Sequence, residues 1–487
     1  MEKLNKKRVG REAKSAVAFT FASVFSRGLA VVSMPIFTRI MSTAEIGIVS
    51  LYNSWFSMIS VVATLALSAG GYSLAMKEFA DERDKYESSV LSLTSLMALL
   101  LAGIYFAAPD FWSSFTGLPP HLMGLMLVGF LVSPAWDFWT LRQRYEYKYR
   151  LASLLTVVEA VAATVLSVVV VLKLSSMGSD SIAEGRLFGN YSVVYGFCAV
   201  AWLVTMARGR TFFNARYWSY SLSLSLPLIG YSIASQVLGV SDRVLIANMV
   251  GQSEAGIYGT LYSASTISTF VWTAINSSFV PYLYQHIEEE GHQGIRRTSL
   301  QLLMGFGAVS VVISWFGPEI IRVLATEEYM TALDIMPPIA AGVFLTSVSN
   351  MYSNVLVYHH RTKYIMFSAV AAAVVNIVLN LALIPVFGYK VAAWVTLVGY
   401  VALVLPQYLW AQRAAAEEGR KTPVYNDRLI FVVSLVVICL IMLGLVFYQL
   451  ATIRYLACAL LVIVGIVAAA KIYRGGKNVE KAGRGTC

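Results

Sequence analysis

The chain has 487 residues, of which 57% are hydrophobic and only 13% are charged, and its mean hydropathy is +0.66. Soluble globular chains carry about 45–50% apolar residues, so this composition excludes a soluble protein and indicates a polytopic membrane protein. The net charge of +10 does not call for a nucleic-acid partner, because lysine and arginine are enriched in the cytoplasmic loops and tails of membrane proteins.

About fourteen segments are long and apolar enough to cross roughly 30 Å of hydrocarbon as helices. The fourth is short and the seventh has polar interruptions, so twelve or thirteen spans are open alternatives. In chain order the predicted spans cover residues 15–41, 45–68, 88–108, 121–139, 151–172, 187–206, 221–250, 256–283, 299–317, 333–357, 364–387, 391–411, 429–450 and 452–472.

The predicted fold is all-α, with two pseudo-symmetric six-helix bundles and an additional C-terminal helix pair. Basic stretches separate these parts, which gives an N-terminal bundle over 1–207, a C-terminal bundle over 208–412, and two further spans with a tail over 413–487. No connection is long enough to fold alone as a further domain.

A short repeat supports two related halves. Glu45–Ile48 reads EIGI and Glu254–Ile257 reads EAGI, and each copy follows a long apolar segment and opens the next one. Internal repeats of this kind are how many transporters are built, so the repeat favours a transporter architecture.

The distribution of positive charge predicts the orientation. With the N-terminus inside, most of the 37 basic residues fall in inside loops and tails, where positively charged segments are retained. Both termini are therefore expected in the cytoplasm. The basic start is followed by an apolar run that is too long for a cleaved signal peptide, so it is expected to be the first span.

Four predicted spans, the first, second, seventh and eighth, carry polar stripes at steps of three or four residues. The stripe in the first span contains Thr20, Ser23 and Arg27, and the others are rich in serine and threonine. Small hydroxylated residues also allow dry helix packing. Because the four stripes occupy equivalent places in the two halves, they favour a water-filled central cavity.

Arg27 lies near the middle of the first span, where an unpaired charge costs about 2.5–3.5 kcal/mol on insertion scales. A guanidinium binds phosphate or carboxylate through two parallel hydrogen bonds, so Arg27 is a candidate anion-binding residue. The alternative is a structural ion pair with Glu159 of the fifth span.

Oxygen-bearing residues suggest a site for a coupling ion. Asp242 and Arg243 either neutralise each other, or Asp242 binds a cation or proton while Arg243 meets a substrate. Asn376 and Asn380 lie one turn apart, with Thr396 on the next span, and their oxygens suit a small hard cation. Interhelical hydrogen bonds account for these three residues equally well.

Other kinds of site are not indicated. Cys198, Cys439, Cys458 and Cys487 lack metal-ligand spacing, so neither a metal site nor a disulfide is expected. Nothing resembles a nucleotide-binding loop, which leaves an ion gradient or the substrate gradient as the energy source. No cofactor is expected apart from a coupling ion, Na⁺ or H⁺.

Two groups of motifs resemble a known family. The first is Pro35–Ser42 leading to Glu45–Gly47, and the second is Leu226-Pro227 followed by Asp242-Arg243 and Glu254–Tyr258. With these motifs the chain resembles, over almost its whole length, the oligosaccharide flippases of the multidrug/oligosaccharidyl-lipid/polysaccharide exporter superfamily. The branch is that of polysaccharide biosynthesis proteins or O-antigen translocases.

The resemblance implies two facing six-helix bundles that carry a polyprenyl-pyrophosphate-linked glycan from the inner to the outer leaflet of the bacterial cytoplasmic membrane. It implies alternating access, and a lipid tail that stays in a cleft between the bundles. A polysaccharide polymerase and other assembly proteins are conceivable partners. The residues suited to the pyrophosphate and the glycan are Arg27, Arg243, Asn53, Tyr262 and Asn276.

Related lipid II flippases use several cavity arginines and, in some members, a sodium site. Here Arg27 is the only arginine clearly in the middle of the first span, which makes a peptidoglycan precursor a less expected substrate. The residues that would serve ion coupling are Asp242, Asn376, Asn380, Thr396 and Glu159.

Two other functions are alternatives. A multidrug or cation antiporter of the same fold usually relies on buried acids, and the scarcity of acids in the middle of the spans, Glu159 apart, argues against it. A membrane glycan polymerase or ligase is disfavoured by short outer loops without paired carboxylates, so no enzymatic activity is expected.

Overall fold

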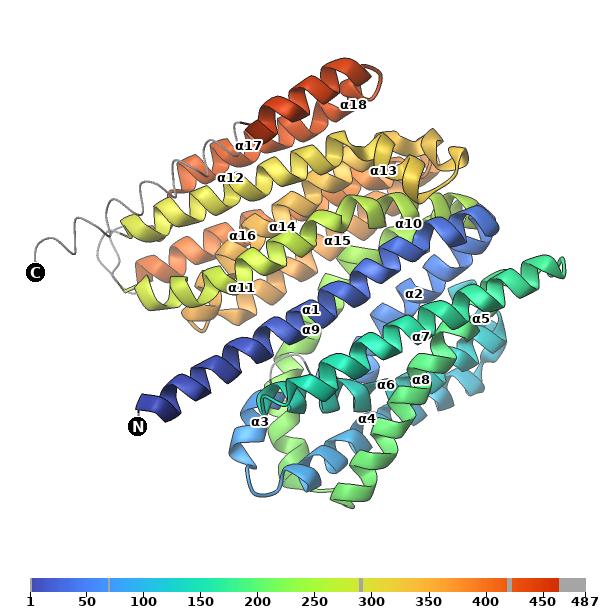
Figure 1. Cartoon of the computed structure of the whole chain (residues 1–487), viewed down its shortest axis with the longest axis vertical. Helices are drawn as coiled ribbons and strands as arrows, with labels where there is room; N and C mark the ends of the chain where they lie inside the picture. Colours follow the sequence, from blue (N-terminus) through green and yellow to red (C-terminus); the bar gives the residue numbers. More distant parts are fainter. Residues whose placement is uncertain (1, 69–70, 289–291, 418–422, 464–487) are drawn as a thin grey trace, which may run out of the picture. The chain divides into compact units, whose positions relative to one another are not determined.

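The computed structural model describes residues 2–68, 71–288, 292–417 and 423–463 (Figure 1). Throughout these ranges every regular element is a helix. The predicted all-α fold is therefore confirmed.

The chain divides into two compact units, which are described separately. Unit 1 comprises Met1–Thr260, Val323–Glu328 and Ala369–Tyr389, and unit 2 comprises Leu261–Arg322, Tyr329–Ser368 and Lys390–Cys487. The boundaries predicted after residues 207 and 412 stay predictions.

Unit 1 contains the first nine helices, the start of α10 and most of α15. Their bounds are α1 Glu2–Ile40, α2 Thr43–Ala63, α3 Tyr72–Glu78, α4 Arg83–Ala107, α5 Pro109–Thr116, α6 Pro120–Tyr145, α7 Tyr149–Ser176, α8 Ile182–Gly209, α9 Ala215–Met249, α10 Gln252–Ser265 and α15 Thr362–Phe387.

Unit 2 contains the end of α10 and most of the remaining helices, including two 3₁₀ segments. Their bounds are η1 Thr266–Ser268, α11 Thr269–His286, α12 Gln293–Trp315, α13 Gly317–Leu324, η2 Glu327–Ile335, α14 Met336–Tyr358, α16 Val391–Glu417, α17 Asp427–Met442, α18 Gly444–Phe447 and a further helix Ala451–Ile463.

Within the described residues, 11 helices are long and apolar enough to cross a membrane, or 12 if the bent α9 counts as one span. The predicted span over 256–283 is not among these helices, and the structure divides it into α10, η1 and α11. The predicted span over 452–472 is described only as far as Ile463, and its remainder lies outside the described residues. The count of about fourteen stays a prediction.

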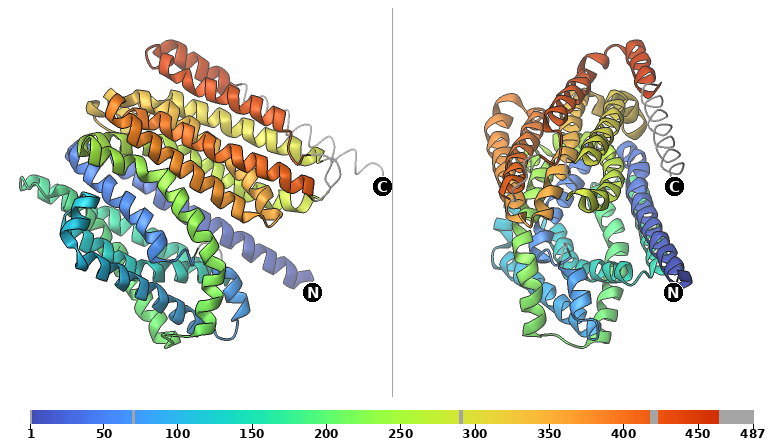
Figure 2. Two further views of the ribbon diagram at one scale, coloured as in Figure 1. Left: turned by 180° about the vertical axis from the view of Figure 1, so that it is seen from behind. Right: turned by 90° about the vertical axis from the view of Figure 1, so that its left-hand side faces the viewer.

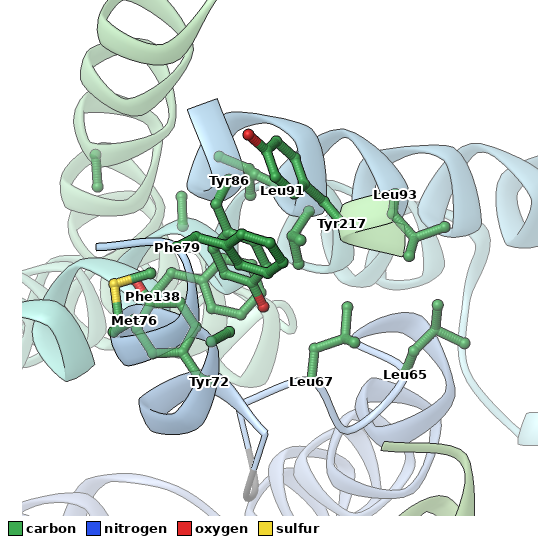
Figure 3. Close-up of a cluster of buried hydrophobic side chains, with 14 residues drawn as sticks. Leu65, Leu67, Tyr72, Met76, Phe79, Tyr86, Leu91, Leu93, Phe138 and Tyr217 are labelled. Atoms are coloured by element: carbon green, nitrogen blue, oxygen red, sulfur yellow. The ribbon is translucent and has the colours of Figure 1, made fainter. Parts of the chain in front are cut away.

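An aromatic core holds the short α3 and the start of α9 against α4 and α6 in unit 1 (Figure 3). The rings of Tyr72 and Phe138 stack with centroids 5.3 Å apart, and Phe79 stacks on Tyr86 at 5.2 Å. Tyr217 from α9 meets Phe79 edge-on at 4.8 Å. Aromatic pairs in these offset and edge-on geometries add to the stabilisation that burial provides.

A charged cluster adjoins this core. Arg142 near the end of α6 is bound by Asp84 and Glu87 of α4, and its Nε donates to Glu146 at 3.0 Å. Tyr72 of the aromatic core donates to Glu87, and burial together with the Glu87 carboxylate raises the pKa of Tyr72 well above its usual value. Aromatic core and charged cluster therefore form one continuous contact region.

The two copies of the repeat meet in unit 1. A β-carbon added to Gly47 on α2 would lie 1.8 Å from the carbonyl oxygen of Gln252, and one added to Gly256 on α10 would lie 2.0 Å from the carbonyl oxygen of Thr43. Thr43 precedes Gly47 by four residues, as Gln252 precedes Gly256. The two helix starts therefore cross backbone to backbone, which only glycine permits.

Glu45 of the first copy has a local role. Its Oε2 accepts from the backbone N of Ser42 at 2.7 Å, while the Ser42 hydroxyl accepts from the backbone N of Glu45. This reciprocal capping box fixes the first residue of α2. The crossing of the two repeats therefore starts from a rigid helix end.

Unit 2 is built around α14, whose side chains are mostly buried. The hydroxyl of Ser349 on α14 donates to Gln407 on α16 at 2.6 Å, and Tyr352 donates to Asp427 on α17 at 2.9 Å. The last described helix is attached through Arg454, which is 2% exposed and is paired with Glu319 of α13. The polar groups of unit 2 thus link successive helices.

Candidate functional site

Arg27 lies on a separate polar face of α1. Successive residues of a helix turn by about 100°, so Arg27 shares a face with Thr20 and Ser23, as predicted. A second face bears exposed apolar side chains, and a third is buried against unit 1. The apolar face includes Phe21, Val24 and Val32, and the buried face includes Ala22 and Ser33.

Because the faces of α1 are separate, each one meets different surroundings. Phe21 is 65% exposed and Val32 is 70% exposed, as expected for side chains against hydrocarbon. Arg27 is also exposed but lies on the polar side, where an intramembrane charge is tolerated if it meets water, a partner or a ligand. This geometry suits the predicted anion-binding role.

Asn53 of α2 adjoins an aromatic wall of unit 1. Tyr191 of α8 donates its hydroxyl to Asn53 Oδ1 at 2.8 Å. The ring of Tyr191 also contacts those of Tyr52 at 5.3 Å and Phe56 at 5.8 Å. Asn53 is exposed, so its amide combines two donors and an acceptor with an aromatic surface, a combination that suits hydroxylated ligands.

A buried polar cluster joins α9, α10 and α15 within unit 1. Ser241 donates to Asn376 Oδ1 at 3.0 Å, and Asn380 Nδ2 donates to the same oxygen at 3.1 Å. Asp242 follows Ser241 and is 1% exposed, and its Oδ2 accepts from Tyr258 at 2.7 Å. The structure thus places three of the predicted ion-coupling residues on contacting segments.

Two side-chain amide atoms of this cluster lack a hydrogen-bond partner among the described residues. Asn376 and Asn380 are both fully buried, yet Asn376 Nδ2 and Asn380 Oδ1 have no hydrogen-bond partner among the described residues. An unpaired buried acceptor costs about 1–3 kcal/mol, and an amide oxygen is a ligand of hard cations. The oxygen of Asn380 is thus available to a cation, and a cation site at this cluster stays a prediction.

Thr396 and Glu159 are the other predicted coupling residues. Thr396 belongs to unit 2, where it is buried on α16 and its hydroxyl donates to Ala392 O at 2.9 Å. Glu159 on α7 of unit 1 accepts a hydrogen bond from Trp136 and lies close to Asp137, both on α6. The contacts of Glu159 are thus with α6, which gives no support to the alternative pairing with Arg27.

Asp137 is a residue that the sequence analysis missed. It is an exposed carboxylate on the membrane-spanning α6, with Arg144 and Glu159 as its charged neighbours. The signal was present, because Asp137 falls inside the fourth predicted span, 121–139. Its position near the end of that short segment obscured it.

Three further predicted residues have defined surroundings. Arg243 of α9 is half-buried, and its Cδ lies 3.6 Å from the place that a β-carbon on Gly259 would take. In unit 2, Tyr262 is buried, and Asn276 Oδ1 accepts from Asn354 Nδ2 at 3.0 Å. Among the described residues, no group of three or more His, Cys, Asp or Glu side chains is arranged to hold a metal.

Solved structures with the same fold come from two transporter groups. A lipid II flippase MurJ in an inward closed conformation matches with a TM-score of 0.64 and 14% identity, over 94% of this chain and 99% of its own. An inward-facing multidrug resistance MATE family transporter of the MOP superfamily matches with a TM-score of 0.61 and 12% identity, over 84% of this chain and 100% of its own. At such identities the likeness shows the fold alone.

Sequence comparisons add a relative and a family. An uncharacterized membrane protein of Methanocaldococcus jannaschii is 21% identical over 229 residues, so the match spans 45% of this chain and 44% of that relative. Residues 13–287 match the family described as "Polysaccharide biosynthesis protein". That match covers more than half of the 487 residues, and it confirms the resemblance found in the sequence motifs. The chain is a membrane protein that belongs to the polysaccharide biosynthesis protein family.

Proposed function

We propose that the protein is a flippase that moves polyprenyl-pyrophosphate-linked oligosaccharides from the inner to the outer leaflet of the bacterial cytoplasmic membrane. The units moved would serve a surface polysaccharide such as O-antigen, capsule or exopolysaccharide, and both termini would face the cytoplasm. The family and the shared fold support a transporter of lipid-linked sugars. The observation that carries the proposal is the polar, exposed face of α1 with Arg27 at its middle.

The chemistry of the substrate explains why such a face is needed. A diphosphate that bears sugars cannot enter hydrocarbon, because each charged or unsatisfied polar group costs several kcal/mol there. Arg27 would bind the diphosphate through its planar guanidinium. Asn53, held by Tyr191, would exchange hydrogen bonds with sugar hydroxyls.

Transport would proceed by alternating access, with the glycan headgroup crossing and the tail remaining in lipid. We propose that a coupling cation binds at the cluster of Asp242, Asn376 and Asn380, with Na⁺ as the first candidate. The unpartnered Asn380 Oδ1 supports this choice. The reaction needs no covalent step, so the protein would act without catalysis.

A second candidate function is a cation or drug antiporter. Asp137 and Glu159 lie close together on the membrane-spanning α6 and α7, and carboxylates within the membrane are groups that can bind cationic substrates and protons. The shared fold with a multidrug transporter is compatible with this function. The two candidates differ in the charge of the substrate, and an assay can separate them.

The test is leaflet-resolved detection of polyprenyl-linked glycan in cells with and without the protein. The flippase proposal expects the glycolipid to accumulate on the cytoplasmic side after depletion. Unchanged sidedness would refute it. Increased sensitivity to cationic drugs in the same cells would then favour the antiporter.

Arg27→Ala should slow flipping by about ten- to a hundredfold, the effect of losing a hydrogen bond to a charged group. Arg27→Lys keeps the charge but loses the bidentate geometry, so it should restore part of the rate. Flipping is measured in proteoliposomes, with the detergent elution profile of each variant as the folding control. Equal rates for wild type and Arg27→Ala would exclude an anion-binding role for Arg27.

A further inference from the structure

A groove of about 560 Å³ runs along α8 of unit 1, away from Arg27 and from the polar cluster. Helix α8 packs against both α6 and α7 (Figure 1, Figure 2). Most of the lining comes from α8, which we call the floor of the groove, and α6 and α7 supply the rest, which we call its walls. Its lining is almost entirely apolar and aromatic. The lining residues are Trp136, Trp139, Leu155, Ser192, Val193, Gly196, Phe197, Val200, Ala201 and Val204.

The shape of the groove suits a chain more than a compact molecule. Its floor extends from Ser192 to Val204, which corresponds to about 18 Å of helix. The rings of Trp136 and Trp139 stack 4.9 Å apart on one wall, and Phe197 meets Trp136 edge-on at 5.6 Å. The volume lies within the range of roughly 300–1,000 Å³ that ligand sites occupy.

One end of the groove is positively charged. Arg208 lies one turn beyond Val204 on the same face of α8, and Arg150 lies in the first turn of α7. Both side chains are exposed, and within the part of the chain that the structure describes neither forms an ion pair or a hydrogen bond. The positive-inside pattern places these helix ends at the cytoplasmic surface, so the groove runs through the cytoplasmic half of the membrane.

We infer that this groove binds the polyprenyl tail of the lipid-linked glycan before transport, with Arg208 and Arg150 near its diphosphate. The inference rests on the proposed function, because it names where part of that substrate docks. The positive end favours a lipid with an anionic headgroup, and the apolar and aromatic lining suits its hydrocarbon chain. A tail held on unit 1 in the cytoplasmic leaflet would keep the headgroup at the membrane surface from which transport starts.

Gly196 offers a direct test because nothing lies within 4 Å of the place where its β-carbon would project. Gly196→Leu should therefore fill the groove without distorting α8, and leucine favours a helix more than glycine does. Gly103 on α4 is an equally open helical glycine outside the groove, so Gly103→Leu is the matched control.

The assay uses purified protein in proteoliposomes and a polyprenyl diphosphate that carries a diazirine in its tail. After illumination, mass spectrometry should find the label on residues 192–204. In Gly196→Leu the labelling should fall by about tenfold, the order expected when an occupied site is overpacked. Gly103→Leu should label like the wild type.

A second pair of probes tests the charged end. Arg208→Gln should weaken labelling by the diphosphate probe but not by the neutral polyprenol that carries the same diazirine. Overlapping labelling by a diazirine phospholipid at equal concentration would identify ordinary membrane lipid as the occupant and overturn the inference. Unchanged labelling in Gly196→Leu, or absence of label from residues 192–204 in the wild type, would overturn it as well.

The outcome is separable from that of the proposed function. If Gly196→Leu flips at the wild-type rate and no label is found in the groove, the tail site is refuted and the flippase proposal stands. Label in the groove of a protein that flips nothing supports the tail site and refutes the flippase.

Discussion

At the scale of single residues, Gly47 and Gly256 show what a short sequence repeat does in space. Each glycine faces a backbone carbonyl rather than a side chain, so no rotamer change can relieve a clash there. Three residues further on, a β-carbon on Gly259 would lie 2.5 Å from Ser50 Oγ, which extends the close crossing by one turn. The repeat motif is therefore a packing motif, with Glu45 as its helix cap.

Gly256→Val should destabilise the protein by about 1–3 kcal/mol, because the backbone of α2 must move away. The measurement is the thermal unfolding midpoint in detergent, with Gly103→Val as a control, since the latter position is open. Equal midpoints for the two variants would contradict the backbone contact between α2 and α10.

The same scale shows what the sequence could and could not predict. The polar face that holds Arg27 follows from spacing within one helix, whereas the capping box of Ser42 and Glu45 is seen only in the structure. The bond between Ser241 and Asn376 joins residues that are 135 positions apart, and no periodicity reports such a pairing. Asp137 was missed because boundary uncertainty placed it at the edge of a span.

At the scale of helices, the charged cluster decides how α4 and α6 are held together. Arg142 has three acidic partners, and Glu146 has Lys148 at 2.5 Å and Arg83 at 3.7 Å as further cations. Burial raises the pKa of Glu146, but the hydrogen bonds from Lys148 and Arg142 outweigh this and leave it below its usual value. The hydrogen bond from Tyr217 likewise lowers the pKa of Glu82.

The pKa of Glu146 is lower in the folded protein than in the unfolded chain, so its ionised form stabilises the fold at any pH above the unfolded-chain pKa. This contribution is lost as the pH falls through the pKa of the folded protein. The unfolding midpoint of the wild type should therefore drop more between about pH 7 and about pH 4 than that of Glu146→Gln. Glu82 remains in both proteins and cancels in the comparison. Parallel pH profiles would show that Glu146 does not contribute.

The helix scale also shows a feature of one predicted span that its sequence did not reveal. The segment 256–283 mixes apolar residues with many serines and threonines, and its backbone tightens into η1 at Thr266–Ser268. Each of these three residues is flanked by other small or hydroxylated residues, and serine and threonine hydroxyls compete for backbone carbonyls. Thr266, for example, donates to Ser263 O at 2.9 Å. Apolarity alone does not report such local competition.

At the scale of the whole molecule, the proposed transport needs a source of energy, and the sequence holds no motif that resembles a nucleotide-binding loop. The Asp242, Asn376 and Asn380 cluster brings together segments that lie more than a hundred residues apart in the sequence. A cation bound at this cluster would favour the conformation that keeps these segments together. It can do so because a ligand shifts a conformational equilibrium by the difference between its affinities for the two conformations.

Wild-type flipping in proteoliposomes should accelerate when a sodium gradient is imposed, whereas Asp242→Asn should flip at the same rate with and without the gradient. The substitution keeps an oxygen that can accept from Tyr258 but removes the charge that attracts the cation. A potassium gradient is the control for membrane potential. Acceleration of the wild type by a proton gradient and not by sodium would replace Na⁺ with H⁺ as the coupling ion.

The crossing of α2 with α10 has the form of an isologous interface, in which the same surface of two copies meets itself. Gly47 faces Gln252, and in the same way Gly256 faces Thr43. In an oligomer such self-complementarity follows from identical copies, but here the two copies are different segments of one chain and differ in sequence. A bulky residue in either copy meets the unchanged backbone of the other. Because each glycine faces backbone, no substitution in the other copy can make room for a larger residue. Each half of the chain therefore restricts the residues that the other half can carry at this crossing.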